Sequence, residues 1–134
     1  MKDTNLVFVC NFDGLSCVEA AAQSRYSLPG DTRIVRVSCL SRVHSGLILE
    51  AFELGARGII LLGCEGARCH FGVGQEQADA NVRRAHHLMK LLGFDISRLI
   101  LARLPHGDGA GFAKMVTRFS RENAPATAVQ GEVG

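Results

Sequence analysis

The chain is 134 residues long, which predicts a single domain. Its composition, 47% hydrophobic and 21% charged, is typical of a globular protein with its own apolar core. Fifteen Lys and Arg residues against thirteen Asp and Glu residues give a formal net charge of +2, which argues against a dedicated nucleic-acid-binding protein. The longest apolar run, residues 58–64, is too short to cross a membrane, and the first residues lack the pattern of a signal peptide. We therefore expect a cytoplasmic protein without a membrane span.

Short apolar runs alternate with helical patterns four times along the chain. The runs are residues 6–9, 32–37, 58–62 and 98–102. Each run is followed by apolar residues at helical spacing, within residues 15–22, 47–55, 78–92 and 112–119. Ser45 is expected to cap the second helix. This βαβαβαβα pattern predicts an α/β fold, with one parallel sheet and helices on both of its faces.

The residues within the runs also predict the strand order. Residues 6–9 and 58–62 are unbroken apolar runs, as expected for strands that are covered on both faces, whereas residues 32–37 and 98–102 carry arginines and are typical of edge strands. A flavodoxin-like order of 2-1-3-4 fits this pattern. We expect the α/β domain to span residues 1–123 and residues 124–134, which lack periodicity, to form a flexible or partner-docked tail.

Four of the five cysteines follow predicted strands. Cys10 comes directly after the first strand and Cys39 two residues after the second, while Cys64 and Cys69 follow the third. The carboxyl ends of parallel strands meet at one edge of the sheet, and ligand sites form there where the strand order reverses. We therefore expect these four side chains to converge, and we expect Cys17, inside the first helix, to be buried.

Cysteines in a chain without an export signal favour metal binding or catalysis over disulfides. Four thiolates can hold either zinc or an iron–sulfur cluster. Zinc sites usually combine two Cys-x2-Cys pairs, whereas this chain has one Cys-x4-Cys pair, Cys64 and Cys69, and two distant single cysteines. The spacing favours a [2Fe–2S] cluster with four ligands. It leaves two alternatives, a thiol/disulfide or persulfide redox enzyme and a zinc-stabilised interaction module.

Three motifs occur in order: Cys10-Asn11-Phe12, an arginine-rich run from Arg33 to Cys39, and a Gly-Cys-x4-Cys-His-aromatic loop at residues 63–71. Together they resemble the hydrogenase delta-subunit family, the small iron–sulfur subunit of methyl-viologen-reducing hydrogenase, over residues 5–122. The resemblance implies a [2Fe–2S] cluster held by Cys10, Cys39, Cys64 and Cys69. It also implies an electron-transfer subunit, not catalytic by itself, in an anaerobic complex. Its partners would be a heterodisulfide reductase A-like flavoprotein and other redox subunits.

The chain departs from the family pattern at two places. Asp13 stands where family members commonly have a second cysteine, and Leu40-Ser41 stands where they tend to have Ser-Gly. Cys17 lies one helical turn after Asp13 on the same face, so we hypothesise that Cys17 partly restores the lost thiol near the cluster. His70 and His106 are expected near the same edge, and we interpret both as loop histidines rather than ligands.

Overall fold

The computed structural model describes residues 3–63 and 74–123. The strands are β1 (Asn5–Cys10), β2 (Thr32–Val37), β3 (Gly58–Gly63) and β4 (Leu99–Arg103). The α-helices are α1 (Asp13–Gln23), α2 (Ser45–Glu53), α3 (Gly74–Leu92) and α4 (Gly109–Glu122), and two short 3-10 turns are η1 (Leu40–Arg42) and η2 (Ile96–Arg98). The predicted tail, residues 124–134, lies outside the described residues, so the domain division stays a prediction.

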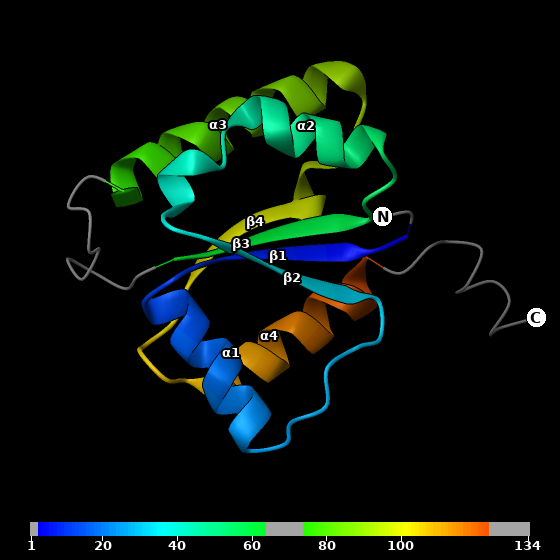
Figure 1. Cartoon of the computed structure of the whole chain (residues 1–134). Helices are drawn as coiled ribbons and strands as arrows, with labels where there is room; N and C mark the ends of the chain where they lie inside the picture. The colour runs from blue at the N-terminus through cyan, green and yellow to red at the C-terminus, as the bar shows by residue number, and fades with distance from the viewer. Residues whose placement is uncertain (1–2, 64–73, 124–134) are drawn as a thin grey trace, which may run out of the picture.

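The four strands form one parallel sheet in the order β2-β1-β3-β4, which confirms the predicted order. Figure 1 shows α2 and α3 on one face of the sheet and α1 and α4 on the other. Every residue of β1 and β3 is buried, because helices cover both faces of these central strands. The strands β2 and β4 are the edges, as their arginines predicted.

The apolar side chains form two cores, one on each face of the sheet. On the α2 and α3 face, Leu61 packs with Ile48 and Met89, and all three are fully buried. On the α1 and α4 face, Val9 and Ile60 pack with Phe112. Because successive strand residues point to opposite faces, each central strand contributes to both cores.

Helix α2 begins at Ser45 but is capped by the residue before it. The Leu47 backbone N–H donates to His44 Nδ1 at 3.2 Å, so the expected Ser45 cap was wrong by one position. The helix ends at Glu53, and Gly55 follows with φ +106°, a left-handed conformation that glycine adopts without strain. The apolar pattern therefore predicts that α2 exists but does not predict which residue caps it.

Candidate functional site

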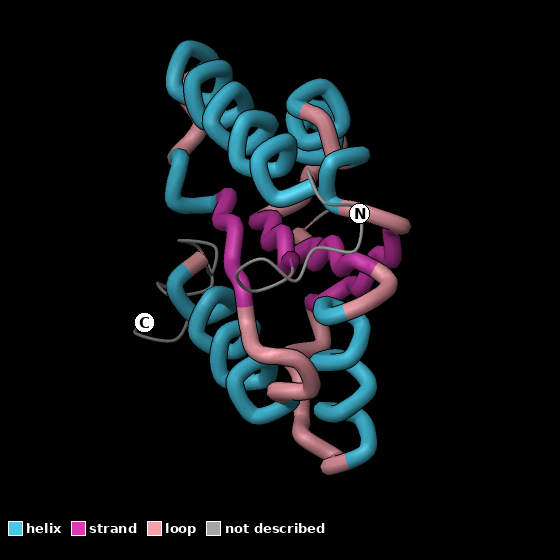
Figure 2. The backbone as a smooth tube through the Cα atoms, turned by 90° about the vertical axis from the view of Figure 1, so that its left-hand side faces the viewer, coloured by secondary structure: helices cyan, strands magenta, loops and turns pink. Residues whose placement is uncertain are grey.

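Two of the predicted ligand cysteines lie at the carboxyl edge of the sheet. Cys10 is the last residue of β1 and is 4% exposed, and Cys39 lies two residues beyond the end of β2 and is 6% exposed. The β1–β2 register pairs Cys10 with Val37, so both cysteines lie at the same end of neighbouring strands. Figure 2 looks onto this edge, where the carboxyl ends of all four strands face the viewer.

The amino end of α1 lies against the Cys10 sulfur. The Gly14 backbone N–H donates to Cys10 Sγ at 3.2 Å. Helix α1 begins at Asp13, so the positive end of its dipole also faces this sulfur. Backbone N–H groups that donate to cysteine sulfur are a common feature of iron–sulfur and other metal sites.

Gly14 makes this close approach possible. A Cβ atom added at Gly14 would lie 2.8 Å from the Leu62 carbonyl oxygen and 3.3 Å from Cys10 Sγ. Real Cβ atoms do not approach a backbone oxygen that closely, so any other residue would push α1 away from β1 and β3. The sequence Cys10-Asn11-Phe12-Asp13-Gly14 thus brings a helix terminus onto the sulfur of its own first residue.

Glycine also allows the second cysteine loop to pack on β3. A Cβ atom at Gly63, the last residue of β3, would lie 2.9 Å from Leu40 Cδ1. Leu40 directly follows Cys39 and is 4% exposed. The β1–β3 register pairs Val9 with Leu62, so the next residues, Cys10 and Gly63, are level. Cys39 is therefore held beside the strand end that leads into Cys64.

Three other predicted site residues follow β3 in the sequence and lie outside the described residues: Cys64, Cys69 and His70. Within residues 3–63 and 74–123, no three His, Cys, Asp or Glu side chains are grouped closely enough to hold a metal ion. The two predicted ligands that are described, Cys10 and Cys39, nevertheless fit a cluster ligand role. Both are buried at one edge, and the Cys10 sulfur receives a backbone N–H.

Asp13 and Ser16, both in the first turn of α1, hold the loop that joins β4 to α4. Asp13 is 5% exposed, and its Oδ1 lies 2.9 Å from His106 Nδ1. The Ser16 hydroxyl donates to the Asp13 carbonyl oxygen at 2.6 Å and accepts the Gly107 N–H at 2.9 Å. The residue that departs from the family pattern thus contacts a histidine 93 positions away in sequence, beside the predicted site.

Cys17 has a structural position in the core. It is fully buried among residues of the α1 and α4 face, and its thiol donates to the Pro105 carbonyl oxygen at 3.3 Å. Burial raises the pKa of the Cys17 thiol above its ordinary value, so the group stays protonated at neutral pH. The expected burial is confirmed, and the hypothesis of a thiol near the cluster stays a prediction.

Comparison with known proteins identifies the family. The family model described as methyl-viologen-reducing hydrogenase, delta subunit, matches residues 6–123. The chain belongs to this family. The resemblance inferred from the cysteine motifs is therefore confirmed over nearly the whole length.

Individual relatives of this chain include proteins of two kinds. One kind is similar in length: an F420-non-reducing hydrogenase iron-sulfur subunit of Archaeoglobus profundus is 33% identical over 118 residues, covering 87% of this chain and 86% of the relative. An F420-non-reducing hydrogenase vhu iron-sulfur subunit of Methanocaldococcus jannaschii is 26% identical over 120 residues, covering 90% of each chain. These similar-length relatives are named as iron–sulfur subunits.

The second kind of relative is much longer. A ferredoxin:CoB-CoM heterodisulfide reductase subunit of Methanosarcina mazei is 28% identical over 117 residues, covering 87% of this chain. This chain spans only 15% of the length of that relative.

In the part of the chain that the structure describes, no helix has the length and apolar character needed to cross a membrane.

Sequence reasoning found the cysteines but missed how the neighbouring loop is held. The contacts of Asp13 with His106 and of Cys17 with Pro105 join residues 93 and 88 positions apart. No local sequence pattern predicts contacts between residues so far apart. The one available signal was the predicted topology, which places the end of the first strand and the loop after the fourth at the same sheet edge.

Proposed function

We propose that this chain carries one [2Fe–2S] cluster on Cys10, Cys39, Cys64 and Cys69 and relays electrons within a larger redox complex. When bound, such a cluster takes up and returns one electron at a time. The chain's own residues supply the four thiolates, a largely buried setting and a surface for partners. We propose the cytoplasm as its location, because reduced thiols persist there.

The observation that carries the proposal is the environment of Cys10. Its sulfur is buried at the carboxyl edge of the sheet and accepts the Gly14 N–H at 3.2 Å. Hydrogen bonds to cluster sulfurs and low solvent exposure are the features by which proteins tune iron–sulfur sites. The names of the similar-length relatives, which describe iron–sulfur subunits, support the presence of an iron–sulfur cluster.

The proposed electron partner is a heterodisulfide reductase A-like flavoprotein. A segment similar to this chain lies within a relative that is named as a heterodisulfide reductase component. In that relative, the segment is fused to the rest of a longer redox protein. Where the segment is a separate chain, it is expected to dock on the counterpart of that remaining part. The other partner would be a hydrogenase-type or dehydrogenase-type subunit.

The experiment is metal analysis and spectroscopy of the anaerobically purified protein. We expect about two irons per chain, visible charge-transfer bands that bleach with dithionite, and a single half-spin EPR signal after reduction. Stoichiometric zinc without a redox change would favour the interaction module instead. A metal-free protein with a titratable dithiol, after anaerobic reconstitution has been attempted, would favour the thiol enzyme. Either result would contradict the relay.

A further inference from the structure

The strand β4 is an edge strand that remains open in the described residues. It pairs with β3 alone, and its side chains from Ile100 to Arg103 are only half-buried. Ile100 packs toward the α1 and α4 core and Leu101 toward the α2 and α3 core. At the start of the strand, His86 of α3 contacts the Leu99 carbonyl oxygen at 2.8 Å, so the open stretch begins at Ile100.

A groove lies beside β4 on each face of the sheet. The groove between β4 and α4 has a volume of about 560 Å³, and its apolar lining includes Ile100, Met115 and Phe119. The groove between β4 and α3 has a volume of about 390 Å³ and is lined by Val82 and by residues along β4. An added strand would place alternate side chains into these two grooves, which is how extended segments bind sheet edges.

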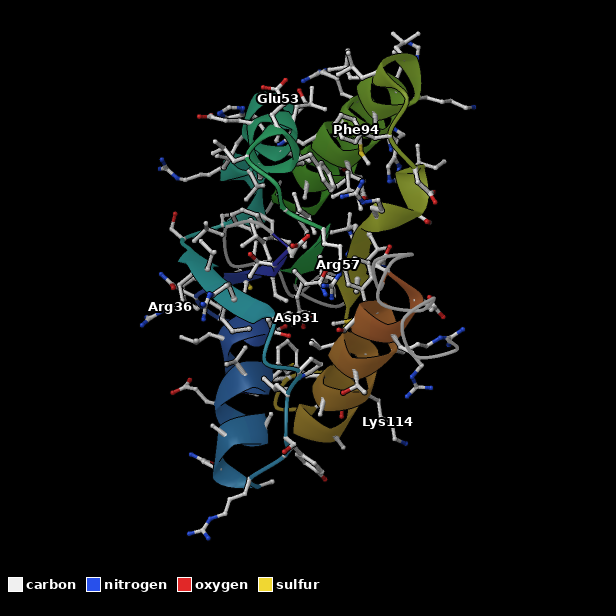
Figure 3. All side chains as sticks on the ribbon, turned by 90° about the vertical axis from the view of Figure 1, so that its right-hand side faces the viewer. Asp31, Arg36, Glu53, Arg57, Phe94 and Lys114 are labelled. Atoms are coloured by element: carbon white, nitrogen blue, oxygen red, sulfur yellow. The ribbon has the colours of Figure 1, made fainter. Side chains whose placement is uncertain are left out.

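The charges around the grooves are mostly positive. Four cationic side chains line them: Arg83 and Arg103 on the α3 side, Lys114 and Arg118 on the α4 side. The two acidic side chains are already paired, Asp79 with Arg103 at 3.1 Å and Glu122 with Arg118 at 2.8 Å. Arg83 and Lys114 are exposed and form no ion pair among the described residues. Figure 3 shows Lys114 pointing outward from α4.

The opposite edge of the sheet is protected differently. On β2, Arg33 and Arg36 are exposed, and charged side chains on an edge strand oppose pairing with another chain. From Leu99 to Ala102, β4 carries no charge of its own. A second copy of this chain would bring the same excess of positive charge to β4, so like charges would oppose edge-to-edge dimerisation.

We propose that the outer edge of β4 binds, as a fifth strand, an extended acidic segment of the partner redox protein. This inference rests on the proposed function, since it names the docking surface of the relay. Arg103 is level with Gly63 in the β3–β4 register, so an added strand would end at the edge that carries Cys10. With strands about 4.8 Å apart, it would lie three spacings, roughly 14 Å, from β1.

The first test is hydrogen–deuterium exchange on the complex isolated anaerobically through an affinity tag on this chain. We expect the amides of residues 100–103 to exchange more slowly in the complex than in the free chain, with no change in β2. Exchange at β4 that is equal in the two samples would overturn the proposal. This comparison uses the unmodified chain and so does not depend on a variant that folds.

The second test introduces a charge at each edge in turn. Ile100→Lys and Ile34→Lys are matched, because both residues are half-buried edge-strand isoleucines that pack toward the same core. We expect Ile100→Lys to weaken binding of the purified partner roughly tenfold and Ile34→Lys to leave it unchanged. Equal effects of the two substitutions would overturn the assignment of the surface to β4.

The third test addresses the charge of the partner. Lys114→Glu reverses a charge at the groove, and Lys90→Glu makes the same change at an exposed position of α3 that lines neither groove. We expect only Lys114→Glu to weaken the complex, mainly through slower association at low salt. The proposal of an acidic partner segment would be wrong if Lys114→Glu strengthened the complex. It would also be wrong if the free chain were a dimer that Ile100→Lys dissociates. Iron content measured on every variant separates these results from failure of the proposed relay.

Discussion

At the amino ends of the strands, charged side chains pair with one another and with backbone groups. Asp31, which precedes β2, is paired with Arg57, which precedes β3, and Ser120 of α4 donates to both Asp31 carboxylate oxygens at 3.1 Å. Figure 3 looks onto this end, with Asp31 and Arg57 close together. At the carboxyl ends, by contrast, two buried cysteines, Cys10 and Cys39, lie at or just beyond the ends of neighbouring strands.

The difference separates stability from function within one sheet. Arg98 completes the amino-end network by donating to the carbonyl oxygens of Ala56 and Arg57, which ties β4 to the start of β3. Asp31, Arg57 and Arg98 are each paired there. Cys10 and Cys39, by contrast, are ligand-type side chains at the edge where parallel sheets bind ligands. Substitutions at the amino end should therefore change stability alone, and substitutions at the carboxyl end should change the cluster.

The largest effect on stability is expected from Arg57→Leu. The substitution leaves Asp31 without its cation, and the Arg57 side chain is only 13% exposed. We expect the free energy of unfolding to fall by about 2 kcal/mol, measured by chemical denaturation, while iron content per folded chain stays unchanged. Arg118→Leu is the matched control, because it breaks an exposed pair with Glu122 and should change stability little. Loss of iron from folded Arg57→Leu protein would contradict the expectation that the amino end affects stability alone.

A smaller loss of stability, with an effect on the site, is expected from Gly14→Ala. The added Cβ would lie 2.8 Å from the Leu62 carbonyl oxygen, so α1 must shift and its N–H must leave Cys10 Sγ. We expect a stability loss of about 1 kcal/mol and a lower reduction potential, because a hydrogen bond to sulfur favours the more negative reduced cluster. Gly30→Ala, where an added Cβ meets nothing within 4 Å, is the control and should change neither quantity.

The smallest effect is a pH dependence that comes from Cys17. In the folded protein, burial raises the pKa of this thiol above the ordinary 9.0, whereas in the unfolded chain it ionises near that value. Its contribution to stability is therefore complete below pH 9 and is lost as the pH rises through the folded-state pKa. Cys17→Ser keeps a donor for the Pro105 carbonyl but does not ionise. Wild-type stability should fall more steeply than that of Cys17→Ser above pH 9; parallel curves would contradict this.

Most of the fold could be predicted from the sequence, because apolar runs distinguish central strands from edges. The same topology places Cys10 and Cys39 at one sheet edge. What the pattern did not predict were pairings such as Asp13 with His106 and Asp31 with Arg57. Both join segments far apart in the chain. Such contacts depend on how the loops pack against the sheet, and the spacing of residues in the sequence does not predict that packing.

Four of the five cysteines, and not Cys17, are proposed to hold the cluster. The most direct measurement is iron content and the EPR spectrum of the reduced protein in each single Cys→Ser variant after anaerobic reconstitution. Because Cys17 is not proposed as a ligand, Cys17→Ser should keep about two irons and a half-spin signal. Substitution of Cys10, Cys39, Cys64 or Cys69 should remove that signal. Cys10→Ser or Cys39→Ser protein with unchanged iron and spectrum, or Cys17→Ser protein that loses its iron, would contradict this ligand set.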